Sequence, residues 1–160
     1  MQSLSQLLES AGCEQVTTYI QSGNVVFKCN VDSVDQFGEE IGLAIENEHG
    51  FRPAVRLITA DYLTEAIASN PYPKAVSEPK TLHLSFLERP PQEELVHDAK
   101  RLLSKTESFT VVGSLLYMHA PDGIGRSRLA SGIDRALQVE TTGRNWRTVM
   151  KLQELASSIG

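Results

Sequence analysis

The sequence contains little cysteine, few aromatic residues and no long apolar run. Cys13 and Cys29 are the only cysteines among 160 residues, with no Cys-x-x-Cys pair and no Cys/His grouping at zinc spacing. We therefore expect two reduced thiols, with neither a disulfide framework nor a bound metal. No apolar stretch approaches the roughly 20 residues that span a bilayer, so we expect no membrane association.

The N-terminal residues lack the basic, apolar and small-residue segments of a secretory signal, which predicts a cytoplasmic location. The length is typical of one domain or of two small lobes that share a core, and such a chain buries roughly 70% of its unfolded surface. It needs neither a disulfide nor a cofactor for folding, and no cofactor motif is evident. The sequence leaves the oligomeric state open.

The net charge of −5 is unevenly distributed. Residues 126–151 hold six basic side chains against Asp134 and Glu140. An acidic chain repels a polyphosphate backbone, so broad nucleic-acid binding is not expected, although a local basic patch can attract a small anion or a short stretch of RNA. A solvated helix face explains the same pattern without any ligand.

Hydrophobic periodicity in the first half predicts a helix over 3–9 that begins at Ser3, then a hairpin of strands 14–21 and 25–29. A helix follows from Ser33 to Gly50. The alternation over 53–58 predicts another strand, and Thr59 begins a helix that Asn70 and the next prolines end.

The second half predicts a strand over 80–87, a helix over 93–104 and a hairpin of 109–112 with 115–119. A helix over 127–137 and a final helix over about 144–158 complete the chain. The predicted fold class is therefore α+β.

These elements suggest two ferredoxin-like β-α-β-β-α lobes in tandem, followed by a C-terminal helix. The first lobe lacks its opening strand, which in this arrangement lies inside the sheet and pairs with two neighbours. We expect residues 1–160 to form one compact unit, with a truncated lobe at 1–75, a second lobe at 80–142 and a helical segment at 143–160. The sheet edge left open in the first lobe could pair with a second copy.

Three segments, residues 18–27, 121–127 and 142–152, together resemble the domain of unknown function family 1697, whose members are small bacterial proteins. The resemblance spans almost the whole chain and implies a fold without an activity. Family members normally begin with a short apolar strand and an Arg-Gly-Ile-Asn-Val-Gly-Gly-like loop, and neither occurs here. The resemblance therefore predicts that Met1 is an internal methionine of a longer protein, or that the chain is an N-terminal truncation.

The glycine-rich loop over 122–127 is one candidate site. Free N–H groups at a helix start, with Ser127 as cap and Arg126 beside it, can hold an anion. The spacing of a phosphate-binding P-loop is absent, so nucleotide hydrolysis of that class is not indicated. A plain turn followed by a helix cap is the alternative interpretation.

The segment over 142–147 is a second candidate. Arg144 or Arg147 could clamp a phosphate or carboxylate, Asn145 offers an amide, and Trp146 could stack on a base. The structural alternative is that Trp146 anchors the last helix on the core while Asn145 binds backbone groups.

Ser22 and Asn24 form a third candidate, because their polar side chains lie at a sheet end, although the hairpin turn alone explains them. His83 and His119 lie on strands expected to be neighbours, so the two rings could form a pair. Without a third ligand they would make a poor metal site.

Three functions remain open. The one we favour is a binding module for a small anionic or nucleotide-like ligand near the basic C-terminal segment. The second is an enzyme that acts on a phosphorylated or carboxylated metabolite through the same site. The third is an RNA-binding ferredoxin-like module, which would need exposed aromatic rings on its central strands.

Overall fold

The computed structural model describes residues 2–21 and 23–160. The chain contacts divide into two compact units: Met1–Glu65 together with Lys151–Gly160, and Ala66–Met150. Helices accompany two antiparallel sheets, one of two strands and one of four, so the fold is α+β as predicted.

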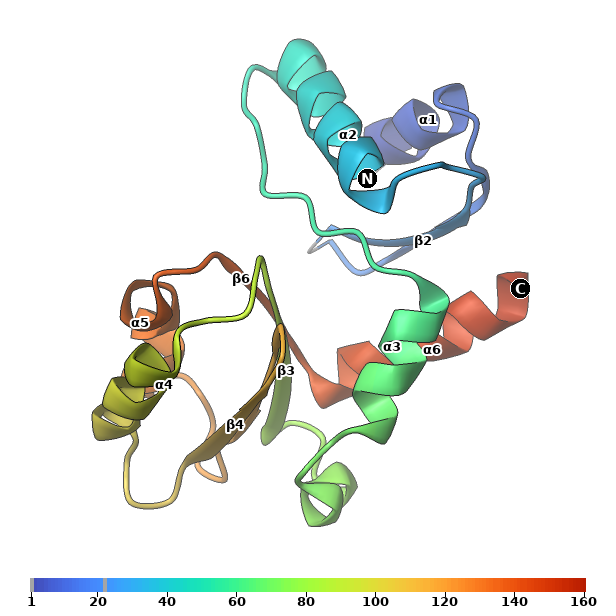
Figure 1. Ribbon diagram of the computed structural model, residues 1–160. Helices are drawn as coiled ribbons and strands as arrows, with labels where there is room; N and C mark the ends of the chain where they lie inside the picture. The colour runs from blue at the N-terminus through green and yellow to red at the C-terminus, as the bar shows by residue number, and fades with distance from the viewer. Residues whose placement is uncertain (1, 22) are drawn as a thin grey trace. The chain divides into compact units, whose positions relative to one another are not determined.

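The first unit contains a hairpin and two helices on one side of it (Figure 1). The elements are α1 (Gln2–Ser10), β1 (Glu14–Tyr19), β2 (Asn24–Lys28) and α2 (Val34–His49). Strand β1 pairs antiparallel with β2, as predicted. The Ser33 hydroxyl caps α2 by accepting from the Gln36 N–H at 3.2 Å, and Gly50 ends the helix with a φ of 78°. Such a positive φ favours glycine.

The core of the first unit is small. Leu8, Cys13, Phe37 and Ile41 are buried, and half-buried apolar side chains from both strands surround them. Ser3 lies inside α1 and bonds to α2 side chains, so it is not the helix cap that the sequence predicts. Helix α3 (Ala60–Ala68) is capped as predicted, because the Thr59 hydroxyl accepts from the Tyr62 N–H at 3.1 Å.

The strand predicted over 53–58 is wrong, because residues 51–59 have no regular secondary structure. The side chains nevertheless alternate, and Val55 and Leu57 pack against the core cluster of the first unit. A strand requires a neighbouring backbone for its hydrogen bonds. The alternation of side chains therefore indicated correctly which residues pack on the core. It could not show that no neighbouring strand pairs with this segment among the described residues.

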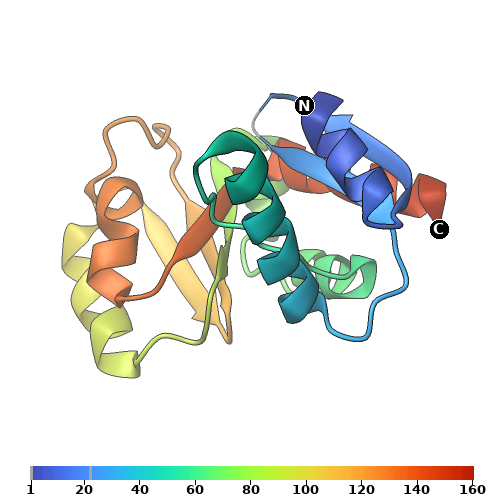
Figure 2. The ribbon, with the colours of Figure 1, turned by 90° about the horizontal axis from the view of Figure 1, so that it is seen from above.

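The second unit contains η1 (Pro73–Ser77), β3 (Leu82–Leu87), α4 (Glu93–Ala99), η2 (Lys100–Leu102), β4 (Ser108–Val112), β5 (Leu115–His119), α5 (Arg128–Leu137) and β6 (Thr141–Asn145). The strand order is β4-β5-β3-β6, with every neighbouring pair antiparallel. Figures 1 and 2 show α4 and α5 together on one face of this sheet. Leu116, Met118 and Leu129 belong to the core between these layers.

The last helix begins later than the sequence predicts. Residues 141–145 form strand β6, which pairs with β3 so that Arg144 lies opposite Leu84, and α6 covers Trp146–Ile159. The Asn145 side-chain oxygen accepts from the Thr148 N–H at 3.0 Å, which fixes the helix start. Residues 141–145 show no apolar alternation, but they form a strand because the edge of β3 offers backbone hydrogen bonds to them.

Buried polar contacts complete the second unit. The Tyr117 hydroxyl is fully buried and donates to the Ala66 carbonyl at 2.5 Å.

In residues 2–21 and 23–160, no helix is both long enough and apolar enough to cross a bilayer.

Candidate functional site

The strand register gathers several polar residues at one end of the four-stranded sheet. His119 at the end of β5 pairs with Leu82, and Asn145 at the end of β6 pairs with His83. The loop 120–127 leaves β5 at this end and leads into α5. We call His83, Arg126, Ser127 and Asn145 the loop-end site.

The loop itself is fixed by short-range bonds. The Gly123 N–H donates to the Ala120 carbonyl at 2.9 Å, and the Ser127 N–H donates to the Ile124 carbonyl at 3.0 Å. Thr106 donates its hydroxyl proton to the Asp122 carboxylate at 2.6 Å, which ties the loop to the start of β4. The loop is therefore held in one shape by neighbouring segments of the same unit.

Ser127 is buried and caps α5, because its hydroxyl accepts from the Ala130 N–H at 3.1 Å. The N–H groups of Arg128 and Leu129 have no hydrogen-bond partner among the described residues. They lie at the positive end of the helix dipole, where anions are favoured. Arg126 is exposed beside them.

His83 has a half-buried ring that shares a sheet face with Met118, the face that α4 and α5 cover. Burial lowers the pKa of His83, and a hydrogen bond to the Lys80 backbone opposes this shift. The Nε2 atom is buried and has no partner in the described part of the chain. The Lys80 bond therefore involves Nδ1, which leaves Nε2 of the neutral ring as an unused acceptor.

Asn145 uses only its oxygen in capping α6, and its exposed amide nitrogen has no partner among the residues that the structure describes. Trp146 is only 2% exposed, so no face of its ring is open for stacking. Its Nε1 is buried, again without a partner within the described residues. Arg147 is exposed in the first turn of α6.

Arg144 points away from Asn145, because successive side chains of a strand face opposite sides of the sheet. It is half-buried, and one guanidinium nitrogen, Nη1, donates to the Gly143 carbonyl at 2.9 Å. Burial lowers the pKa of Arg144. The predicted set therefore divides at this strand, with Arg144 and Asn145 on opposite faces.

The hairpin candidates belong to the first unit, whereas the loop-end site belongs to the second. Asn24 is buried at the start of β2, opposite Tyr19, and belongs to the first unit. Ser22 lies outside the described residues. The register places Asn145 opposite His83, which the sequence analysis had considered only as half of a histidine pair. Arg126 and Ser127 belong to the loop that follows β5, and Arg147 follows Asn145 in the first turn of α6.

The predicted pairing of His83 with His119 is wrong. The strands are neighbours, but His83 pairs with Met118 and His119 with Leu82, so the two rings face opposite sides of the sheet. His119 instead lies against Tyr72, with ring centroids 6.1 Å apart. Among the described residues, no group of three or more His, Cys, Asp or Glu side chains could hold a metal ion.

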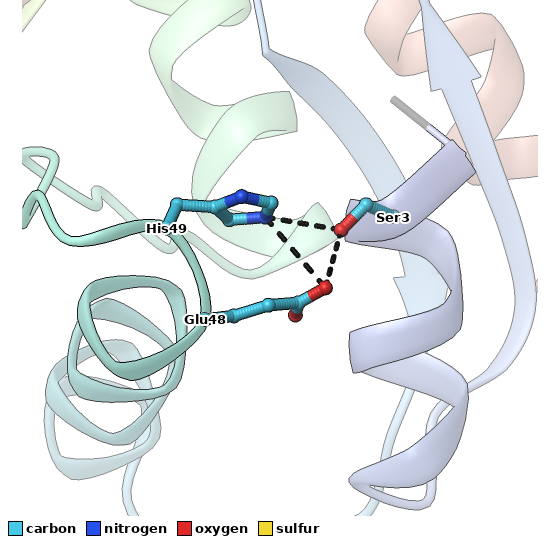
Figure 3. Close-up of polar contacts among 3 residues, drawn as sticks. All are labelled: Ser3, Glu48 and His49. Atoms are coloured by element: carbon cyan, nitrogen blue, oxygen red, sulfur yellow. Dashed lines mark hydrogen bonds and ion pairs between the residues drawn. The ribbon is translucent and has the colours of Figure 1, made fainter.

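A second polar cluster joins α1 to the end of α2 (Figure 3). The Ser3 hydroxyl donates to Glu48 Oε1 at 2.8 Å and lies 3.0 Å from His49 Nε2. A Ser-His-acid relay needs the acid on the other ring nitrogen, whereas Glu48 Oε1 lies 3.8 Å from the same Nε2. The hydroxyl proton points to the carboxylate, so this arrangement does not form a nucleophilic triad.

No pattern along the chain predicts this cluster, because Ser3 and His49 are 46 positions apart. The side chains of the two cysteines also lie close together in space. Cys13 follows α1 and Cys29 follows β2, and both belong to the core of the first unit. Burial and a hydrogen bond with Cys29 raise the pKa of Cys13 to about 12. Cys13 is therefore a protonated thiol at neutral pH.

Comparison with known proteins identifies the family. Residues 1–117 match the family described as protein of unknown function, DUF1697. The chain belongs to the DUF1697 family. The resemblance predicted from the sequence is confirmed, and no function comes with it. None of the curated proteins compared with this DUF1697 chain matches it.

The structure is similar to that of a conserved bacterial protein from Streptococcus pneumoniae, with a TM-score of 0.69 and 20% sequence identity. The similarity covers 98% of this chain and 88% of that chain, and at this identity it supports the fold alone. The DUF1697 match ends at residue 117, so it includes His83 but not Arg126, Ser127 or Asn145.

Proposed function

We propose that this DUF1697 chain is a cytoplasmic binding module for a small phosphate- or carboxylate-bearing, nucleotide-like ligand at the loop-end site. The observation that carries the proposal is the buried Nε2 of His83, which has no partner among the described residues. Buried polar atoms are nearly always paired, so an unpaired one at a sheet end suggests a bound group.

The donors and acceptors of the site define the ligand. The N–H groups of Arg128 and Leu129 and the guanidinium of Arg126 would donate to ligand oxygens. A neutral His83 accepts at Nε2, so the ligand must also carry a proton donor, such as a sugar hydroxyl. Both requirements are met by a phosphorylated sugar or a nucleotide.

A thermal-shift panel of ribose, inorganic phosphate, ribose 5-phosphate and AMP tests this proposal. A ligand that binds only the folded chain at 100 times its Kd stabilises it by about 2.7 kcal/mol. We expect ribose 5-phosphate or AMP to raise the Tm, and neutral ribose to leave it unchanged.

Charge variants locate the site. Arg126→Ala should reduce the Tm shift, whereas Arg135→Ala, at the other end of α5, is the matched control and should keep it. Both arginines are exposed, so neither substitution disturbs the core. The proposal fails if no phosphorylated compound raises the Tm, or if the two variants respond alike.

An enzyme that acts on a phosphorylated or carboxylated metabolite is the second candidate, because a neutral imidazole beside a bound hydroxyl can act as a general base. Turnover of the bound compound, lost in His83→Gln with binding retained, would distinguish it from a binding module. For RNA binding the support is weaker, because Phe86 and Tyr117 on the central strands are buried.

We also infer that the two units are related ferredoxin-like lobes. The order α1-β1-β2-α2 in the first unit repeats the order α4-β4-β5-α5 in the second. In the second unit this series is preceded by β3 and followed by β6. Residues 51–59 come directly after α2 in the first unit, just as β6 comes after α5 in the second. This shared order supports the inference that the two units are related lobes.

A further inference from the structure

The two cysteines lie opposite each other at one end of the hairpin in the first unit. Strand β1 pairs with β2 so that Glu14 is opposite Lys28. Cys13 and Cys29 are the next residues outward, so the same register sets them opposite each other. Both thiols belong to the core of this unit, whereas Glu14 and Lys28 are exposed. The two sulfur atoms therefore lie on the same face of the hairpin.

A bulge in β1 produces this alignment. Nearer the turn, Thr17 pairs with Val26, and continuation of that register would place Cys13 opposite Asn30. The register shifts by one residue within β1, in a stretch that includes Gln15 with a φ of 53°. This left-handed conformation is uncommon outside glycine, and a bulge of this kind redirects the side chains beyond it. The shift brings the two thiols onto opposite positions of the ladder.

Helix α1 fixes the backbone of Cys13. The Cys13 N–H donates to the Leu8 carbonyl at 3.0 Å, and Gly12 turns the chain with a φ of 91°. Because this N–H is used within the turn, Cys13 and Cys29 form the closer, non-hydrogen-bonded type of pair, in which opposed Cα atoms lie about 4.5 Å apart. Disulfides span Cα separations of about 4.4–6.8 Å. A bond between the two sulfur atoms therefore fits the folded hairpin.

The two thiols differ in access. Cys13 is only 5% exposed and packs in the core with Leu8, Phe37 and Ile41, whereas Cys29 is half-buried. A small reagent therefore reaches Cys29 first. The only other thiol of the chain is in hydrogen-bond contact with it and is shielded from reagents in solution. Cys29 thus has the position of an attacking thiol, and Cys13 that of a resolving thiol.

We propose that Cys13 and Cys29 are a modification site, which a small disulfide such as glutathione disulfide converts into a reversible cross-strand disulfide. The resting chain carries two reduced thiols. Oxidation ties the end of α1 to the end of β2, and an excess of reduced glutathione releases them.

Two exchange steps account for all atoms and electrons. The Cys29 thiolate attacks one sulfur of glutathione disulfide, whose S–S bond breaks and releases one glutathione thiolate. The Cys13 sulfur then attacks the Cys29 sulfur of this mixed disulfide, and the second glutathione leaves and takes up the Cys13 proton. Two protein thiols are oxidised while one glutathione disulfide is reduced to two glutathione molecules.

The contact between the sulfur atoms favours the second step. The raised pKa of Cys13 keeps its thiolate scarce, which slows this step. Part of that shift comes from the charge of Cys29, which is lost once Cys29 carries glutathione. A reacting group held in contact also acts at a high effective concentration.

A glutathione titration of the full chain, quenched with acid and analysed by mass spectrometry, tests the proposal. The internal disulfide lowers the mass by two hydrogen atoms, whereas the mixed disulfide adds one glutathione. We expect the internal disulfide to form in the folded chain with an effective concentration at least about tenfold above that of the urea-unfolded chain, where only a flexible linker joins the thiols.

Two variants separate the register from the mere presence of two thiols. Cys13→Ser should accumulate the mixed disulfide at Cys29, with Cys13→Ala as the second choice should the serine variant not fold. The matched control is Cys29→Ser combined with Asn30→Cys, which keeps two thiols but moves one by a single position to the opposite face. In this control the advantage of the folded chain over the unfolded chain should disappear.

A mixed disulfide that persists at Cys29 in the parent chain would overturn the proposal. The same conclusion follows if neither thiol of the folded chain reacts, if disulfide-linked dimers form instead, or if the advantage over the unfolded chain is smaller than expected. An internal disulfide that forms equally well in the Asn30→Cys control would also refute it, because the register would then play no part.

Discussion

The pairing of β6 with β3 positions Asn145 beside His83, and a single glycine permits this close pairing. Gly143 lies opposite Ser85, and a Cβ added to Gly143 would lie 2.9 Å from Ser85 Oγ. Real Cβ atoms do not approach an oxygen so closely. We therefore expect Gly143→Ala to destabilise the folded chain.

The structure gives an order of magnitude for this loss. Adding a methyl group to a packed site costs about 1–3 kcal/mol. Replacing glycine by alanine in a strand contributes about 0.5–1 kcal/mol in the opposite direction through the unfolded chain. The expected net loss in the free energy of unfolding is about 1 kcal/mol, reduced to the extent that Ser85 changes rotamer.

A second substitution isolates the contact. Ser85→Ala removes Oγ, and the next nearest atom, Ser85 Cβ, lies 4.0 Å from the added Cβ, which is an ordinary contact. In the Ser85→Ala background, Gly143→Ala should therefore be neutral or slightly stabilising. The double-mutant cycle should give a coupling energy of about 1–2 kcal/mol.

Urea unfolding measures all four proteins. Trp146 is the only tryptophan and is buried in the second unit, so its fluorescence reports on this unit directly. Gly132→Ala in α5 is the matched control, because its Cβ would meet only Leu102 Cδ1 at 4.0 Å, and it should stabilise the helix by about 1 kcal/mol. If Gly143→Ala proves as stable as the parent, or if the two changes are additive, the register of β6 is wrong.

Three further predictions test single side chains. Because burial lowers the pKa of His83 below its usual 6.5, the unfolded chain takes up this proton first, so stability should fall as the pH drops below 6.5 toward the folded-state pKa. His83→Gln should flatten this fall in urea titrations between about pH 5 and 8; an unchanged slope would contradict the burial of a neutral ring. Cys29 should react with a disulfide reagent well before Cys13, whose pKa of about 12 keeps it protonated until the chain unfolds. Equal rates for the two thiols, measured by mass spectrometry, would argue against this. Ser127→Ala should cost about 1 kcal/mol through loss of the α5 cap, with Ser127→Asp as the control that keeps an acceptor.

Local sequence signals predicted most helices and both hairpins correctly. Gly12 and Gly50 end helices with φ values of 91° and 78°, and Ser33, Thr59 and Ser127 cap the next ones. These signals act within a few residues, so they can be recognised without knowledge of the fold.

The two errors in strand prediction have one cause. Residues 53–58 alternate in hydrophobicity but form no strand, whereas residues 141–145 do not alternate and form β6. A strand depends on hydrogen bonds to a neighbouring backbone, and only the tertiary structure shows where such a neighbour lies.

The candidate site shows the same division. The sequence predicted candidate binding segments that contain Arg126, Ser127, Asn145 and Arg147. Helix caps and basic side chains near helix starts can be recognised from a few neighbouring residues, so this prediction needed no knowledge of the fold. It placed Arg144 and Asn145 together in a helix, but a strand sends them to opposite faces. The family, the α+β class and the caps at Ser33, Thr59 and Ser127 were thus determined by residue types and short spacings along the chain. Strand pairing and the approach of His83 to Asn145 were decided by the tertiary structure, because hydrogen bonds between distant segments depend on register rather than on local pattern.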